Sequence, residues 1–307
     1  MNKLLEFRRR FLSTFPPIFL PKRERKDIII AGSGRGGTTW LLNIIASLPG
    51  YRVIFEPFHP IQCKKEFNSP FSRPYLRAFD ENKELENYIK KLLTQRIKNK
   101  FINSRNKRFI TYQTVIKFIR ANLLLDWLYH HFHLPIVFMI RHPCAVVLAR
   151  IKLRWGSHLD EFLTQKKLME DFLAPYEDFI QDIIKEGKKH KEYALMWAIE
   201  NFIPLKWIPN RPWFLITYEE LFINRTQLLK KLFRYLGYEY SLKIEKESYK
   251  LSSTAAAKDK IEIEQKLILS KWQHELSNEE IKDILDIIEK FEVSLYNSDI
   301  IPHKPYF

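Results

Sequence analysis

The stretch "IIIAGSGRGGTTWLL", residues 28–42, constrains the fold more than any other part of the chain. A short apolar run enters a turn rich in glycine and continues into residues with the composition of a helix. A strand that turns sharply into a helix aims the N–H groups of the turn and the positive end of the helix dipole at one place. The stretch therefore predicts a strand–turn–helix unit that binds a phosphate group.

Apolar strands alternate with helices along the rest of the chain. Strands are predicted at 27–31, 51–55, 109–118, 135–140 and 213–217. Helices are predicted at 38–47, 121–132, 144–154, 159–207 with an interruption at 185–190, 225–236 and 278–296. Ser277 and Glu280 have the spacing of a capping box for the last helix. This alternation predicts an α/β fold, a three-layer sandwich with a central parallel sheet.

The length and composition favour one large domain. The 307 residues are 46% hydrophobic, which is enough for a single extensive core. We expect a basic arm over 1–26 followed by one domain over 27–307. The segment 61–108 is polar, basic and poor in strands, which indicates an insertion of the kind that often carries substrate specificity. The segment 241–275 is expected to be a loop elaboration.

The net charge of +15 favours an anionic partner, although a solvated basic surface explains it equally well. The arm holds a basic cluster and a short apolar stretch broken by Pro16 and Pro17. That stretch falls far short of the roughly 20 apolar residues of a membrane span. The arm either rests on anionic lipid headgroups or is a frayed end. Cys63 and Cys144 indicate reduced thiols, and hence a cytoplasmic protein.

Two general phosphate motifs fit the glycine turn in part. Gly32, Gly34 and Gly37 satisfy G-x-G-x-x-G, and Glu56 ends the next strand where a dinucleotide-binding fold has its acidic ribose ligand. The same turn begins a Walker A loop, but Thr38 stands where that loop needs its lysine. An NTPase or kinase therefore lacks the clamp on its phosphates. An NAD(P)-dependent oxidoreductase stays open.

A third interpretation uses the residues that these motifs leave idle. Arg35 lies within the turn, and Thr38, Thr39 and Trp40 follow it at once. A forked cation and two hydroxyls add donors for one anion, and the indole offers a flat face to a base. The string R-G-G-T-T-W resembles the 5′-phosphosulfate loop of sulfotransferases that use 3′-phosphoadenosine 5′-phosphosulfate (PAPS), a family with the pattern K/R-x-G-T-T/S-W/F.

The resemblance recurs, in order, from about residue 27 to 295. The segment "IVFMIRHPCAVVLAR" (136–150) is similar to the family's 3′-phosphate segment, with Arg141 at the place of the arginine that grips this phosphate. The segment "WFLITYEEL" resembles the strand that ends in Y-E-D-L, which implies that Tyr218 lies near the adenine. The segment "KLILSKWQHELSNEE" places Lys266 and Trp272 at the matching C-terminal positions. The resemblance implies a P-loop NTPase-like fold.

Two departures from the family pattern bear on the site. The usual serine eight residues after the arginine is replaced by Ala149, so that Arg150 or a loop residue must supply the missing bond to the 3′-phosphate. In "IKFI", Lys117 holds the lysine place of the small-molecule branch, but Ile119 replaces its histidine base. The segment "FEPFHP" (55–60) instead resembles the carbohydrate branch. This makes Glu56 the candidate base and His59 the alternative.

The resemblance implies transfer of a sulfuryl group from PAPS to a carbohydrate or glycolipid hydroxyl, without a metal. Glu56 takes the proton, and Arg35 and Lys117 stabilise developing charge. The segment "HHFH" (130–133) has no third metal ligand nearby. No nucleic-acid partner is expected, and a basic module that binds nucleic acid or membrane gives the glycine turn no role. The implied donor-binding set is Arg35, Gly36, Gly37, Thr38, Thr39, Trp40, Arg141, Arg150, Tyr218 and Lys266.

Overall fold

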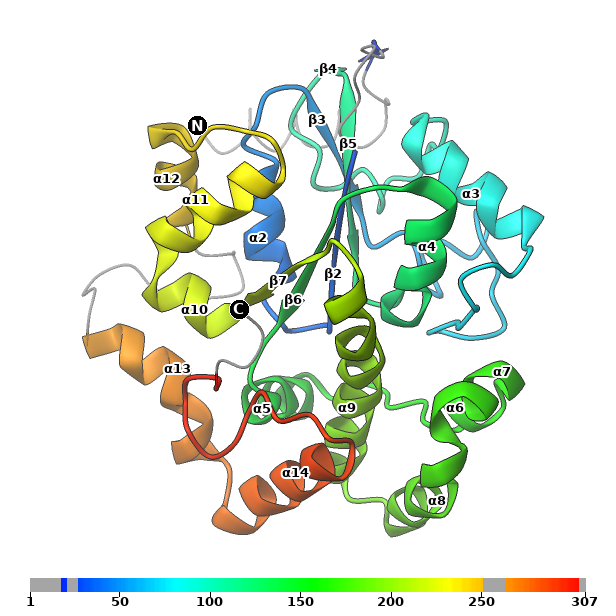
Figure 1. Cartoon of the computed structure of the whole chain (residues 1–307), viewed down its shortest axis with the longest axis vertical. Coiled ribbons are helices and arrows are strands. Elements are labelled where there is room, and N and C mark those ends of the chain that lie inside the picture. The colour runs from blue at the N-terminus through cyan, green and yellow to red at the C-terminus, as the bar shows by residue number, and fades with distance from the viewer. Residues whose placement is uncertain (1–17, 21–26, 251–262, 304–307) are drawn as a thin grey trace.

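The fold is built on a five-stranded parallel sheet (Figure 1). The computed structural model describes residues 18–20, 27–250 and 263–303. The strands are β2 (Ile28–Gly32), β3 (Tyr51–Phe55), β5 (Gln113–Phe118), β6 (Ile136–Ile140) and β7 (Phe214–Thr217). They lie in the order β3-β5-β2-β6-β7, and all of their pairings are parallel. The predicted α/β fold with a central parallel sheet is confirmed.

The strand order separates this sheet from a dinucleotide-binding sheet. There the first strand of the unit lies beside the second, with the acidic ribose ligand at the end of that neighbour. Here β5 lies between β2 and β3, since Ile30 pairs with Lys117 and Phe55 pairs with the same lysine from the other side. Glu56 therefore stands two strands away from the glycine turn, which removes the geometric basis of the dinucleotide interpretation.

Period-two alternation along the strands builds the two helical layers. Ile28 and Ile30 pack into one core with α2 (Thr38–Ile45), α10 (Tyr218–Ile223), α11 (Arg225–Tyr235) and α12 (Leu242–Ser248). Ile29 and Ala31 face the opposite core, which also contains residues of α3 (Lys83–Leu93), α4 (Leu125–Phe132), α5 (Pro143–Leu153) and α9 (Lys189–Trp207). Figure 1 shows α2 with α10–α12 on one side of the sheet and α3 with α4 on the other.

The predicted helical region 159–207 is confirmed as a series of short helices that leads to α9. It contains α6 (Asp160–Leu163), α7 (Lys166–Leu168), a π-helical turn (Met169–Leu173), a 3₁₀ turn (Ala174–Tyr176) and α8 (Glu177–Glu186). Gly187 ends α8 in the left-handed conformation, at the predicted interruption. Near the C-terminus, α13 (Ile263–Glu275) is followed by α14 (Asn278–Lys290), which begins with the predicted Ser277–Glu280 capping box.

Two predicted boundaries are wrong. The strand expected at 109–118 breaks at Tyr112, because the N–H groups of Tyr112 and Gln113 both bond to the carbonyl of Gly50. Its first part, β4 (Ile110–Thr111), pairs instead with β1 (Ile18–Phe19). The last helix ends at Lys290 rather than 296, since Glu292 takes a positive φ of 55°.

The described residues of the expected loop at 241–275 are mostly helical, as α12 and α13. Ser241 caps α12 by accepting a hydrogen bond from the N–H of Ile244. The side chain of Ile244 is then buried in the core beside α2. The strand-poor segment 61–108 contains the helix α3, which Asn82 caps. In both segments, the many charged residues obscured the apolar spacing that indicates an amphipathic helix, so no helix was predicted there.

Candidate active site

The turn between β2 and α2 depends on glycine at two positions. A Cβ atom on Gly32 would lie 2.1 Å from the carbonyl oxygen of Met139 on the neighbouring strand. Gly37 has φ +90°, and a Cβ atom there would lie 2.4 Å from the Tyr218 ring. Arg35 adopts a φ of 74° between them, a left-handed conformation that costs a non-glycine residue about 1–3 kcal/mol. The turn is therefore held by its surroundings and directs one arginine inward.

The N-terminus of α2 is prepared for an anion. Gly37 is its N-cap and gives no side-chain cap, and no acidic residue lies in the first turn. Among the described residues, the hydrogen bonds of the turn leave the N–H groups of Thr38 and Thr39 without an acceptor. Unsatisfied donors at the positive end of a helix dipole favour a negative ligand.

Two arginines face this helix end. The Nη1 atom of Arg141 donates to the carbonyl of Arg35 at 3.2 Å, and the Arg141 guanidinium stacks 4.2 Å from the centre of the Tyr218 ring. Within the described part of the chain, the buried Nε atoms of both arginines lack a partner. Burial, and then the charge of Arg141, lower the pKa of Arg35. Two close guanidiniums with spare donors favour an anion between them, because it would satisfy the donors and offset their mutual repulsion.

The segment that carries Arg141 is fixed from behind by buried polar groups. His142, the N-cap of α5, accepts from the N–H of Cys144 and stacks 4.3 Å from Trp272. The N–H of His142 donates to the buried carboxyl of Glu219, which also accepts from the Tyr296 hydroxyl at 2.9 Å. These contacts leave Arg141 little freedom to turn away from the loop.

A carboxylate and a lysine form the other half of the site. Glu56 follows β3 with a φ of 43°, and its Oε1 atom pairs with the Nζ atom of Lys117 at 2.5 Å. The side chains of Lys117 and Glu56 are 3% and 12% exposed, and Lys117 lies 4.5 Å from the centre of the Phe55 ring. Burial lowers the pKa of Lys117, although Glu56 opposes this. The Oε2 atom of Glu56 has only a 3.9 Å ion-pair contact with Arg120 among the described residues.

His59 is tied into its own turn. Its Nδ1 atom accepts hydrogen bonds from the N–H groups of Ile61 and Gln62, both at 3.3 Å. This arrangement assigns the ring proton of neutral His59 to Nε2. Burial, and then the charge of Arg120, lower the pKa of His59. The lone pair needed to take a proton is thus engaged, whereas one oxygen of Glu56 stays open.

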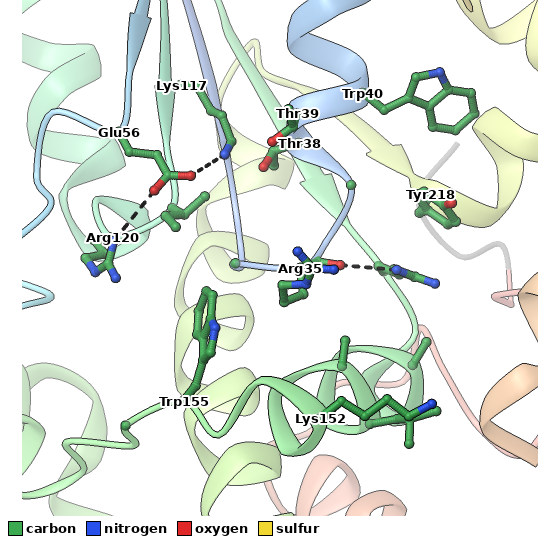
Figure 2. A pocket seen from close by; sticks show the side chains of 18 of the residues that line it. Arg35, Thr38, Thr39, Trp40, Glu56, Lys117, Arg120, Lys152, Trp155 and Tyr218 are labelled. Atoms are coloured by element: carbon green, nitrogen blue, oxygen red, sulfur yellow. Dashed lines mark hydrogen bonds and ion pairs between the residues drawn. The ribbon is translucent and has the colours of Figure 1, made fainter. Parts of the chain in front are cut away.

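These side chains stand in a row because each follows, or ends, a different strand. In parallel strands all carboxyl ends share one edge of the sheet. The strand order therefore arranges Glu56, Lys117, Arg35, Arg141 and Tyr218 along that edge. All five line one cavity of about 1020 Å³. Figure 2 shows Glu56, Lys117 and Arg120 together at one end, Tyr218 and Trp40 at the other, and Arg35 between them.

Helices α5 and α13 close the cavity opposite the sheet edge. Helix α5 presents one stripe with helical spacing, made of Ala145, Leu148, Ala149 and Lys152. Ala149 thus lines the cavity without a hydroxyl, while Lys152, one turn further on, pairs with Glu275. Helix α13 contributes Leu267, Ile268, Lys271 and Trp272.

Three residues of the predicted donor set have other surroundings. Arg150 is fully buried, donates to Glu200 at 2.6 Å and to the carbonyl of Gly34 at 3.4 Å, and does not line the cavity. Trp40 lines the cavity, but its Nε1 atom donates a hydrogen bond to the carbonyl of Ser248 in the core. Lys266 lies in α13, and its side chain is outside the described residues.

Some residues of the cavity wall were missed by sequence reasoning. Arg120 and Trp155 line it, and Trp155 packs against Gly34 so closely that a Cβ atom there would lie 2.4 Å from the ring. Lys152 was detectable, since it continues a stripe of helical spacing that begins after Arg141. Arg73, from the segment 61–108, had no local signal, because its partner Glu200 is distant in the sequence.

Comparison with known proteins gives one family and several distant structures. A family model described as "Sulfotransferase family" matches residues 27–241, which is more than half of the chain. No curated protein matches. Within the described ranges, no set of three or more His, Cys, Asp or Glu side chains is placed to hold a metal ion. In the same ranges, no helix has the length and hydropathy that crossing a membrane requires.

Three solved structures are similar in fold. The sulfotransferase domain of the Synechococcus PCC 7002 olefin synthase is 15% identical, with 92% of this chain and 100% of that chain covered and a TM-score of 0.47. The sulfotransferase domain from the curacin biosynthetic pathway is 15% identical, with 88% and 99% covered and a TM-score of 0.48. Mouse sulfotransferase SULT7A1, complexed with PAP, is 16% identical, with 96% and 90% covered and a TM-score of 0.46.

Proposed function

The chain belongs to the sulfotransferase family, and from that premise we propose that it moves a sulfuryl group from PAPS to a hydroxyl of a carbohydrate acceptor, such as a glycan, polysaccharide or glycolipid. One observation carries the proposal. The carboxyl edge of the sheet aligns a carboxylate–lysine pair, an anion-binding helix end and a guanidinium with unsatisfied donors in one cavity. These are the groups that a transfer between a nucleotide donor and a hydroxyl requires.

The unsatisfied donors of the site fit the nucleotide. The free N–H groups of Thr38 and Thr39, with Arg35, suit the 5′-phosphate end, together with Gly36, Gly37 and the threonine hydroxyls. Arg141 suits the 3′-phosphate, since its Nε atom has no other described partner. Tyr218 and Trp40, 5.5 Å apart at their ring centres, offer an aromatic wall to the adenine.

Ala149 cannot donate a hydrogen bond to the 3′-phosphate, and residues other than Arg150 are better placed to replace it. Arg150 is committed to Glu200, whereas Lys152 and Lys271 line the cavity beside Ala149. Both lysines pair with Glu275, an exchangeable surface partner. We propose that one of them turns to the phosphate, and Lys266 remains a further candidate.

Residues of the chain itself can take the proton of the acceptor hydroxyl and stabilise the negative charge that develops during transfer. When bound, PAPS supplies a sulfuryl group whose bond to the phosphate oxygen breaks as a bond to the acceptor oxygen forms. The open Oε2 atom of Glu56 accepts the proton of the acceptor hydroxyl, because Oε1 is held by Lys117. Lys117 and Arg35 stabilise the negative charge that develops between them. His59 is less suited to the base role, since its Nδ1 atom is already an acceptor.

Several finer points belong to the same proposal. The carbohydrate acceptor is favoured by the pairing of Glu56 with Lys117 and by Ile119 at the place of a histidine base. We propose one domain over 27–307, in which the insertion 61–108 contributes Ser72 and Arg73 to the cavity. Both cysteines are free, which supports a cytoplasmic protein. The arm over 1–26 lies mostly outside the described residues, and its contact with anionic membrane stays part of the proposal.

Binding of 3′-phosphoadenosine 5′-phosphate (PAP) tests the donor site. We expect PAP to raise the melting temperature of the protein, because a ligand that binds only the folded state stabilises it. NAD(P) serves as the matched comparison. Stabilisation by NAD(P) and not by PAP would contradict the proposal. Mass spectrometry of glycans and glycolipids from cells with and without the protein then identifies the acceptor class.

Glu56→Gln tests the base. We expect turnover to fall by about 10²–10⁴-fold while PAP affinity stays unchanged, since the amide fills the same space but accepts no proton. The exposed Glu239→Gln is the control for a lost carboxylate. Wild-type turnover in Glu56→Gln would move the base role to another residue, with His59 the first to test.

A further inference from the structure

The end of the cavity around Glu56 carries more buried positive charge than its carboxylates balance. Lys117, Arg120 and Arg73 line this end, and Glu56 is the one carboxylate among the cavity-lining residues described. The nearby Glu200 is already shared by two arginines: Arg73 on its Oε1 atom and Arg150 on its Oε2 atom.

Among the described residues of this end, Arg120 is the cation that is held most loosely. Its side chain is 15% exposed, and no described residue forms a hydrogen bond with its buried Nη1 atom. The closest carboxylate oxygen, Oε2 of Glu56, is 3.9 Å away, beyond hydrogen-bond distance. Burial, and then the charge of Arg73, lower the pKa of Arg120. A buried guanidinium with unmade bonds is costly in the free protein, and an oxyanion that bonds it removes that cost.

The donor phosphates have a different place. Arg120 follows β5, whereas the 3′-phosphate group is assigned to Arg141 after β6, and β2 with its loop lies between these strands. Figure 2 shows the Arg120 guanidinium next to Glu56, at the opposite end of the view from Tyr218, with Arg35 between these ends. An anion on Arg120 would therefore stand next to the open Oε2 atom of Glu56, where the acceptor hydroxyl approaches.

We propose that Arg120 selects an acceptor that carries its own anionic group, a carboxylate or a sulfate ester, within one sugar ring of the hydroxyl that reacts. This inference rests on the proposed function and adds a substrate class to it. The guanidinium binds the oxyanion with two parallel hydrogen bonds, which orients the ring and brings the hydroxyl to Glu56. Arg73 adds positive potential to the same wall, and its own position is fixed by Glu200.

Three matched sugars test the proposal: 4-nitrophenyl β-D-glucoside, its 6-sulfate, and 4-nitrophenyl β-D-glucuronide. Their affinities are measured by calorimetric titration of the full chain, with and without saturating PAP. We expect the wild type to bind at least one of the two anionic sugars ten-fold or more tightly than the neutral one, about 1.4 kcal/mol. Which anionic sugar binds separates a carboxylate from a sulfate ester.

Arg120→Gln should abolish that preference and leave the affinities for PAP and PAPS unchanged. Arg96→Gln removes the same charge from an exposed position outside the cavity and should keep the preference. Equal binding of the three sugars by the wild type, or a preference retained in Arg120→Gln, would overturn the inference. A loss of PAPS affinity in Arg120→Gln would overturn it too, by assigning Arg120 to the donor.

The PAP titration of the wild type separates this failure from that of the proposed function. Absence of PAP binding removes the donor site, whatever the sugars do. PAP binding combined with equal affinities for the three sugars removes only the acceptor class.

Discussion

Two residues of the site, Arg35 and Glu56, have positive φ values in positions where most residues avoid them. Such conformations persist only where the surrounding structure imposes them, and they gather at functional sites. The sequence identified both residues by motif, but not their strained backbone. That strain comes from neighbours on other strands, which a single stretch of sequence does not reveal.

Gly37→Ala tests how tightly the turn is enclosed. Gly37 has φ +90° and faces the Tyr218 ring, so we expect the methyl group to displace the ring that lines the donor cavity. We expect the variant to lose about 1–3 kcal/mol of unfolding free energy and to bind PAP more weakly. Chemical denaturation and PAP titration measure the two effects.

Gly187→Ala is the matched control. Gly187 has φ +67° with no atom within 4 Å of an added Cβ atom, so this variant carries the backbone strain without the collision. It should lose about 1 kcal/mol and keep full PAP affinity. Equal PAP affinities in the two variants would show that the Tyr218 ring is not seated against the turn.

At the scale of elements, a buried ionic network joins the insertion, α5 and α9. Arg73 and Arg150 share Glu200, and Arg150 also holds the Gly34 carbonyl of the phosphate loop. Although burial raises the pKa of Glu200, the charges of Arg150 and Arg73 lower it to about 2. The network thus connects the packing of three separate segments to the position of the loop.

Arg150→Ala and Arg141→Ala should separate structure from binding. Removing Arg150 leaves the buried Glu200 short of one partner, and we expect a loss of about 3–5 kcal/mol in the free energy of unfolding. Arg141→Ala should leave stability nearly unchanged and weaken PAP binding. Denaturation and calorimetry of both variants check this. Weaker PAP binding at unchanged stability in Arg150→Ala would return Arg150 to the donor site.

The cap of α5 predicts a dependence of stability on pH. Burial lowers the pKa of His142 to about 4, from an ordinary value of 6.5. Below pH 6.5 the unfolded chain takes up a proton that the folded state refuses. Stability should therefore be complete above pH 6.5 and fall by up to about 3 kcal/mol as the pH drops to about 4.

Urea unfolding between pH 7 and pH 4 measures this loss. His142→Asn keeps a side chain that can cap the helix and should remove this part of the slope. His133→Asn changes an exposed histidine at a left-handed position that asparagine tolerates, and it should leave the slope intact. A slope that persists in His142→Asn would refute the assignment.

At the scale of elements, the sequence predicted a strand or helix correctly where its hydrophobic pattern matches the burial that the neighbouring elements impose. All five strands of the sheet were predicted, because buried parallel strands are continuous apolar runs such as 136–140. Helices α12 and α13 were missed, since their exposed faces are rich in charge and their buried residues few. The split of 109–118 depends on a carbonyl of Gly50, a partner far away in the sequence.

For the whole molecule, motifs predicted which residues meet at the site but not what each one contacts. Glu56 and Lys117 were assigned separately, and their direct pairing follows from the adjacency of β3 and β5. Arg150 was placed among the donor ligands to replace the hydroxyl missing at Ala149. Its actual partner, Glu200, was not recognised because it is 50 residues away in the sequence. Arg120 carries no motif, and only the folded chain shows that no described residue forms a hydrogen bond with its buried Nη1 atom.

The row of side chains along the sheet edge also has a consequence for the synthesis and folding of the chain. It takes one member from each strand, and the last strand, β7, is complete only at Thr217. A ribosome-bound or prematurely terminated chain that ends before this point holds the carboxylate–lysine pair and the phosphate loop, but no wall for the base of the nucleotide. Docking of this final strand is still not enough, because α13 follows it and closes the cavity on the opposite side. We therefore expect competence to sulfate only once the chain has been synthesised through α13.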